Sequence, residues 1–151
     1  MNHHVTSEAD MRLLGVQIAR ALKGGEVIEL IGDVGAGKTT LTKGIAEGLG
    51  ISETVQSPSF TISRVYDAPN DLRLVHYDFY RLQDAGIMAD ELNETIHNAT
   101  TVTIIEWADI VDGVLPSDRL TISIVSPSES ERIVTIAAGG DTSRRILEGL
   151  A

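Results

Sequence analysis

The sequence predicts an α/β fold, a three-layer sandwich in which helices flank a mixed parallel and antiparallel sheet. The first observation is an apolar segment of strand length, Glu26–Ile31, followed by glycines and then by apolar residues at every fourth position. The second is a pair of alternating runs around the turn-forming, proline-containing segment Asp67–Asp71, which predicts an antiparallel hairpin. The third is the compact, β-branched run Thr101–Ile105. A chain of 151 residues suits a single domain, which we expect to span residues 1–151.

The glycine-containing segment, residues 32–40, fits the pattern G-x-x-x-x-G-K-[ST] at every position and lies between a predicted strand and a predicted helix. Its glycines allow a tight turn, so that backbone N–H groups and the positive end of the helix dipole face an anion. Lys38 is expected to reach the β- and γ-phosphates of a nucleotide, and the Thr39 hydroxyl to hold Mg²⁺. The fold is therefore predicted to be P-loop NTPase-like, with a nucleoside triphosphate bound by Asp33, Val34, Gly35, Ala36, Gly37, Lys38, Thr39 and Thr40.

The N-terminal segment is expected to be irregular from Met1 to Val5 and helical thereafter. Ser7, with Asp10 three residues later, resembles a helix start, and a stripe of apolar residues continues to Leu22. Two interpretations of the helix start remain open. It either borders a nucleotide base or simply caps a helix that packs on the sheet.

Two acidic residues end predicted strands. Asp78 closes the second strand of the first hairpin, and Glu106 follows Thr101–Ile105. Magnesium prefers oxygen ligands and keeps several waters, so one such carboxylate can join Thr39 and the phosphates in holding the metal. We assign Glu106 to the metal and Asp78 to a supporting or water-orienting role, and the reverse assignment is also compatible with the sequence.

The C-terminal half is predicted to contain a helix from Ala85 to about Asn98 and a second hairpin from Leu120 to Ala137. A last helix follows, with Thr142 as its expected N-cap. Arg132 lies in the second hairpin, where it either approaches the nucleotide or remains a surface residue. Trp107 is the only tryptophan and is expected to anchor the core or its rim.

Composition narrows the function. The formal net charge is −10, with 12 Lys and Arg against 22 acidic residues, which disfavours direct binding of nucleic acid. The absence of cysteine excludes disulfides and thiolate metal sites. No sequence window has the apolar length of a membrane span, and the N-terminus lacks the pattern of a signal peptide, so we expect a cytoplasmic protein.

Four motifs, in this order, resemble those of the TsaE family, bacterial ATPases of tRNA threonylcarbamoyladenosine biosynthesis. They are residues 32–40, Ser57–Thr61, His76–Leu82 and Ile105–Trp107. The sequence departs from the family's pattern in two places. Ser59 stands where the family usually has Thr, and Met88–Asn93 replaces a Glu-Glu-Leu-Gly type of run.

The resemblance implies a protein that binds ATP with Mg²⁺ and hydrolyses it slowly alone. It further implies two partner proteins, TsaB and TsaD, with which the chain supports threonylcarbamoylation of adenosine 37 in tRNA, the tRNA being reached only through the complex. The roles that the resemblance implies are phosphate binding by Lys38, magnesium binding by Thr39 and Glu106, hydrolysis by Asp78, and a place near the adenine for Ser7 and Glu8.

Two other functions share the phosphate-loop motif. A small nucleoside or nucleotide kinase would need a lid and several arginines around the acceptor, whereas Arg64, Arg73 and Arg81 are scattered along the chain. A GTP-dependent switch commonly carries an Asn-Lys-x-Asp run, and this sequence has none. Both alternatives rank below the ATPase.

Overall fold

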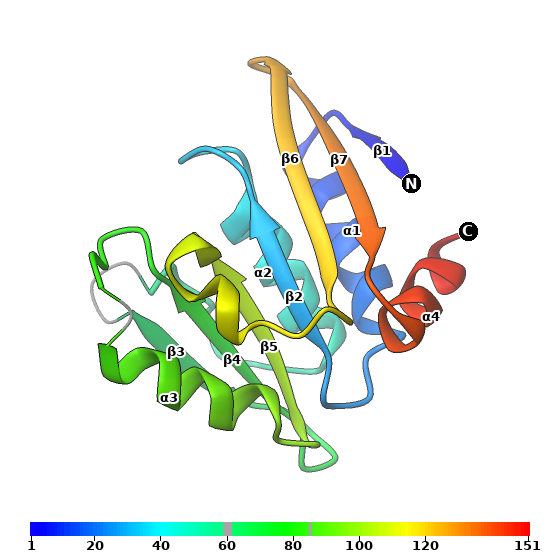
Figure 1. Cartoon of the computed structure of the whole chain (residues 1–151). Helices are drawn as coiled ribbons and strands as arrows, with labels where there is room; N and C mark the ends of the chain where they lie inside the picture. Colours follow the sequence, from blue (N-terminus) through cyan, green and yellow to red (C-terminus); the bar gives the residue numbers. More distant parts are fainter. Residues whose placement is uncertain (59–61, 85) are drawn as a thin grey trace.

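Seven strands form one mixed sheet in the structure, a computed structural model that describes residues 1–58, 62–84 and 86–151 (Figure 1). The strand order is β1-β7-β6-β2-β5-β4-β3. The strands are β1 (Asn2–Val5), β2 (Val27–Ile31), β3 (Ser63–Asp67), β4 (Arg73–Asp78), β5 (Thr101–Glu106), β6 (Leu120–Ser128) and β7 (Glu131–Ala138).

The centre of the sheet is parallel and its margins are antiparallel. β2 pairs in parallel with both β5 and β6, and β5 pairs in parallel with β4. The two predicted hairpins are confirmed, because β3 pairs antiparallel with β4 and β6 antiparallel with β7. This arrangement places the carboxyl ends of β2, β4 and β5 at one edge of the sheet, where ligands bind in open α/β folds.

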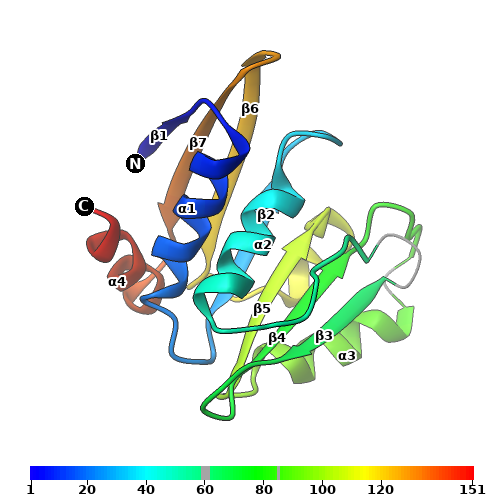
Figure 2. The same ribbon diagram turned by 180° about the vertical axis from the view of Figure 1, so that it is seen from behind.

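Helices cover both faces of the sheet and complete the predicted three layers. α1 (Glu8–Ala19) and α2 (Lys38–Gly48) lie on one face, with α4 (Asp141–Leu150) beside α1 (Figure 2). α3 (Gly86–Ile96) and the 3₁₀ helix η1 (Ala108–Val114) lie on the other face (Figure 1). Each face has its own hydrophobic cluster, one including Ile18, Leu41 and Ile104, the other Tyr77, Leu92 and Ile105.

The prediction of an irregular N-terminal segment is wrong. β1 pairs antiparallel with β7, and the amino group of Met1 donates to the Ile136 carbonyl oxygen at 3.1 Å. The partner strand lies more than a hundred residues away in the sequence. A short polar strand that is held by backbone hydrogen bonds has no clear pattern of side chains from which it could be predicted. The predicted Ser7 cap is present, since its Oγ accepts the Asp10 amide at 3.0 Å, but the helix ends at Ala19 rather than Leu22.

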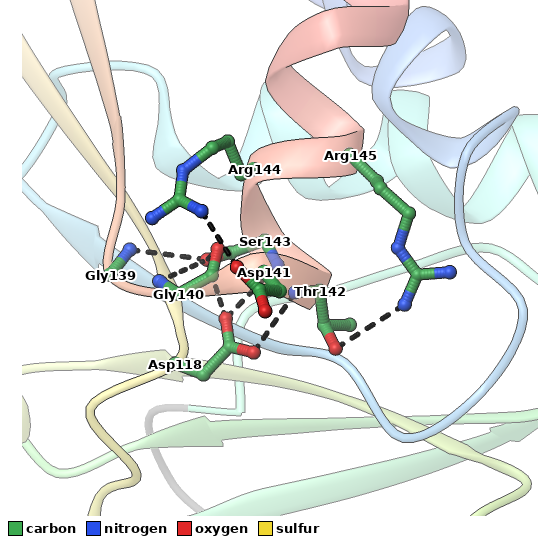
Figure 3. A network of polar contacts seen from close by, with 8 residues as sticks. All are labelled: Asp118, Gly139, Gly140, Asp141, Thr142, Ser143, Arg144 and Arg145. Carbon is green, nitrogen blue, oxygen red and sulfur yellow. Dashed lines mark hydrogen bonds and ion pairs between the residues drawn. The ribbon is translucent and has the colours of Figure 1, made fainter.

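The predicted N-cap of the last helix is also wrong. Gly140 is the N-cap of α4, and the carboxylate of Asp118 satisfies the free amides of the first turn (Figure 3). Asp118 accepts the amides of Thr142 and Ser143 at 3.0 Å and the Ser143 hydroxyl at 2.7 Å. These hydrogen bonds, those of Ser143 first, lower the pKa of Asp118 to about 2. The loop before β6 thus fixes α4 through a residue distant in the sequence.

Two predicted features fall partly outside the described residues. The strand expected to begin at Phe60 is described from Ser63, and residues 59–61 of the second family motif are not described. The predicted helix from Ala85 is confirmed as α3, and residue 85 itself is not described. Within the described ranges, no helix is long and apolar enough to cross a membrane.

Candidate functional site

The phosphate-loop motif connects β2 directly to α2. Gly35 and Gly37 have φ angles of +84° and +112°, which a residue with a side chain rarely adopts. The Ala36 amide donates to the Asp33 carbonyl oxygen at 3.0 Å, and α2 begins at Lys38. The loop therefore delivers a helix N-terminus, with its free amides, to the carboxyl edge of the sheet.

Lys38 extends across the loop toward the neighbouring strand. Its Nζ donates to the Gly32 carbonyl oxygen at 2.5 Å and lies 3.5 Å from Glu106 Oε1. The same nitrogen lies 4.3 Å from the centroid of the Trp107 ring, a cation–π contact. Only 6% of the residue is exposed, so this ammonium is held by charge and aromatic contacts instead of water.

Three polar side chains from β4 and β5 lie on the face of the sheet that α2 covers. Asp78 pairs directly with Glu106, and His76 lies two residues before Asp78. Side chains two apart along a strand share a face, so all three face the same side as Leu74 and Ile104, which pack in the α1–α2 cluster. His76 Nε2 lies 2.6 Å from Glu106 Oε2, whereas Asp78 Oδ1 accepts the Tyr80 amide at 3.0 Å.

A cavity of about 330 Å³ joins the loop to these strand ends. Four of the residues predicted for catalysis and metal binding meet at its wall, and they come from three different elements. They are Lys38, Thr39, Asp78 and Glu106. Val34, Gly35, Gly37, Thr40, Ser57, Tyr80, Arg81 and Trp107 complete the lining.

The oxygen atoms at this cavity fit a magnesium ion bound to phosphate. Thr39, Asp78 and Glu106 offer hydroxyl and carboxylate oxygens, the donors that Mg²⁺ prefers. In the parts of the chain that the structure describes, no cluster of three or more His, Cys, Asp or Glu side chains could hold a metal by itself. The remaining ligands would therefore come from phosphate and water, as is usual for magnesium in nucleotide sites.

A second cavity, of about 280 Å³, lies on the other side of the loop. Ser7 and Glu8 at the start of α1, Ala36 of the loop and Arg132 of β7 are among its lining residues. Arg132 Nε donates to the Ala36 carbonyl oxygen at 3.0 Å, and its Nη1 donates to the Ser128, Glu129 and Glu131 carbonyl oxygens. Arg132 thus ties the loop to the β6–β7 hairpin. Gly35, Gly37 and Thr40 border both cavities, and Asp33 lines neither.

Trp107 has an unusual backbone conformation, with φ 57° and ψ 51° in the left-handed region. This conformation turns the chain from β5 into η1 and places the half-buried indole against Lys38 and Tyr80, whose ring centroid lies 4.8 Å away. Trp107 therefore lies at the rim of the core, one of the two positions expected for it. The sequence patterns predicted no role for His76, although its spacing of two from Asp78 indicates that both side chains lie on the same face of β4.

Comparisons with known proteins identify the family of the chain. The family model of the threonylcarbamoyl adenosine biosynthesis protein TsaE matches residues 5–134. The tRNA threonylcarbamoyladenosine biosynthesis protein TsaE of Bacillus subtilis is 44% identical over 131 residues, which are 85% of this chain and 80% of that protein. The Streptomyces coelicolor protein of the same name is 36% identical over 136 residues, 87% and 92% of the two chains. The crystal structure of Bacillus subtilis YdiB matches with a TM-score of 0.83 and 36% identity, covering 99% of this chain and 93% of that one. The chain therefore belongs to the TsaE family.

Proposed function

We propose that the protein binds ATP with Mg²⁺, hydrolyses it slowly alone, and supports the threonylcarbamoylation of adenosine 37 in tRNA. The observation that carries the proposal is the meeting of Lys38, Thr39, Asp78 and Glu106 at one cavity beside the N-terminus of α2. A helix N-terminus with a lysine and a hydroxyl binds phosphates, and carboxylates on the facing strands serve metal and water.

Each side chain then has a distinct role. The loop amides and Lys38 bind the phosphates, and Lys38 exchanges its contacts with the Gly32 carbonyl oxygen and Glu106 for phosphate oxygens. Thr39 and Glu106 would hold a magnesium ion, which would supply positive charge against the phosphates. Asp78 orients the attacking water. Its Oδ1 accepts the Tyr80 amide, which fixes the carboxylate at the cavity wall.

The second cavity is the proposed nucleoside site. It adjoins the loop through Gly35, Ala36 and Gly37, so a nucleotide with phosphates on the loop can extend into it. Ser7 and Glu8 border the adenine in this arrangement, and Arg132 holds the wall of the site by its bond to the Ala36 carbonyl oxygen.

The tRNA reaction itself is assigned to partners. The proteins to which this chain is similar carry names in tRNA threonylcarbamoyladenosine biosynthesis, and the family resemblance implies TsaB and TsaD as the partner proteins. The net charge of −10 supports the proposal that the chain reaches tRNA only through such a complex. The proposed compartment is the cytoplasm. The cycle of ATP binding and hydrolysis would reset the complex between rounds of modification by ordering and releasing loops around the γ-phosphate.

The test is ATP hydrolysis by the purified chain with and without TsaB and TsaD. We expect the partners to stimulate the wild type, and Lys38→Ala and Glu106→Ala to lose roughly 10²-fold or more of that activity. Lys43→Ala is the matched control, because Lys43 lies on the same helix but lines a cavity away from the loop. Unchanged hydrolysis in both site variants would refute the site. Phosphate transfer to a nucleoside without stimulation by partners would favour a kinase, and preference for GTP would contradict the proposed use of ATP.

A further inference from the structure

His76 is completely buried in β4 and donates a short hydrogen bond to Glu106. The His76 Nε2 to Glu106 Oε2 distance is 2.6 Å, and 0% of the residue is exposed. An ionised carboxylate only accepts hydrogen bonds, so Nε2 carries the proton of this bond. Hydrogen bonds to charged acceptors are roughly twice as strong as neutral ones.

The two carboxylate oxygens of Glu106 have different partners. Oε2 is occupied by His76, whereas Oε1 lies 3.5 Å from Lys38 Nζ. The β4–β5 register places His76 next to Glu106, because His76 pairs with Ile104, which lies two residues before Glu106 on the same face of the sheet. The carboxylate can therefore rotate only by breaking a short, buried hydrogen bond.

Packing alone does not explain an imidazole at this position. Its Nδ1 is buried without a hydrogen-bond partner among the described residues, and an unsatisfied buried polar atom costs about 1–3 kcal/mol. An apolar side chain would fill the space without that penalty. The bond from Nε2 to Glu106 is what the imidazole provides in return.

We propose that His76 is a positioning residue that holds the Glu106 carboxylate so that Oε1 is the oxygen presented to phosphate-bound magnesium. The proposal rests on the proposed function, in which Glu106 holds the metal. Residues that hydrogen-bond to metal ligands fix ligand orientation, and their loss typically costs 10–100-fold in metal affinity or activity.

The test compares His76→Leu with His76→Gln in the full chain. The glutamine amide nitrogen can take the place of Nε2 and donate to Glu106, whereas leucine cannot. Affinity for a non-hydrolysable ATP analogue is measured by calorimetry with Mg²⁺ and with EDTA. We expect His76→Leu to lose about tenfold of the affinity gained from Mg²⁺ while its Mg²⁺-free affinity stays unchanged, and His76→Gln to retain most of the gain.

A double-mutant cycle isolates the contact. In the Glu106→Ala background, which lacks the acceptor, His76→Leu should cause no further loss of the magnesium-dependent affinity. An unchanged magnesium gain in His76→Leu, equal losses in the leucine and glutamine variants, or a loss of Mg²⁺-free affinity would overturn the proposal. Failure of the wild type to bind the analogue would instead overturn the proposed function on which it rests.

Discussion

The contact between α1 and α2 predicts the outcome of adding a single methyl group. A Cβ built on Gly15 of α1 would lie 2.5 Å from the Leu41 carbonyl oxygen, 2.7 Å from the Ile45 nitrogen and 2.8 Å from the Gly44 Cα. All three atoms belong to the backbone of α2, so no side-chain rotation can relieve the overlap. Gly15→Ala must therefore push the two helices apart.

The expected cost follows from two opposing effects. Alanine gains about 1 kcal/mol over glycine within a helix, and overpacking a well-packed core costs typically about 1–3 kcal/mol. Because every close atom is backbone, we expect the upper part of that range and a net loss of about 1–2 kcal/mol. For a protein of this size each kcal/mol lowers the melting temperature by about 2–4 °C.

Gly149→Ala is the matched control for this experiment. Gly149 also lies in a helix, α4, but a Cβ there would meet only the Ala21 Cβ, at 3.9 Å. We expect this variant to gain up to about 1 kcal/mol, less if the helix end frays. Thermal and urea unfolding followed by circular dichroism measure both variants. If Gly15→Ala were as stabilised as Gly149→Ala, the close packing of α1 on α2 would be refuted.

Three further predictions concern single side chains. Asp118→Ala should lower the free energy of unfolding by about 1 kcal/mol at neutral pH. The pKa of Asp118 in the folded state, about 2, lies below its ordinary value of 3.8, so its stabilising contribution is present above pH 3.8 and is lost as the pH falls to about 2. Urea unfolding near pH 2 should therefore give the same free energy of unfolding for the variant and the wild type. Arg132→Gln should weaken ATP binding by roughly tenfold, measured by calorimetry, because the charged bond to the Ala36 carbonyl oxygen is lost, and unchanged affinity would contradict this role. The fluorescence of Trp107 should change when Mg²⁺ and ATP are added, because Lys38 Nζ lies 4.3 Å from the centroid of its ring and is expected to move toward phosphate. An identical fluorescence change in Lys38→Ala would argue against that cause.

Local sequence patterns predicted most of the fold and the meeting of the two acids. Strand, glycine loop and helix are contiguous in the chain, and so are both hairpins, so their short-range patterns suffice. The carboxyl ends of parallel strands lie at one edge of a sheet, so Asp78 and Glu106, which end two predicted strands, were expected at the same edge. The strand register confirms this, because the two residues pair directly.

The features that the sequence did not reveal depend on distant partners. β1 forms on the edge of β7, and Asp118 caps α4 from more than twenty residues away. The role of His76 depends on which face of β4 meets α2, and both faces of that strand are buried. The spacing of two from Asp78 places His76 on the same face as Asp78 but does not show which side chain of β5 it contacts, so only the tertiary structure identifies Glu106 as the partner of His76.

The charges around the cavity that joins the loop to the strand ends bear on the proposed role of magnesium. Its described lining contains two cationic side chains, Lys38 and Arg81, and two anionic ones, Asp78 and Glu106, so the charged side chains cancel. A triphosphate that enters this cavity gains no net electrostatic attraction from these four side chains. Its charge must be met by the loop amides, the α2 N-terminus and a divalent cation, and the two carboxylates attract that cation. On the proposed function, this balance of charge favours binding of the metal–nucleotide complex over the free nucleotide, and the proposed role of His76 is to fix the orientation of Glu106 within this wall through one buried hydrogen bond.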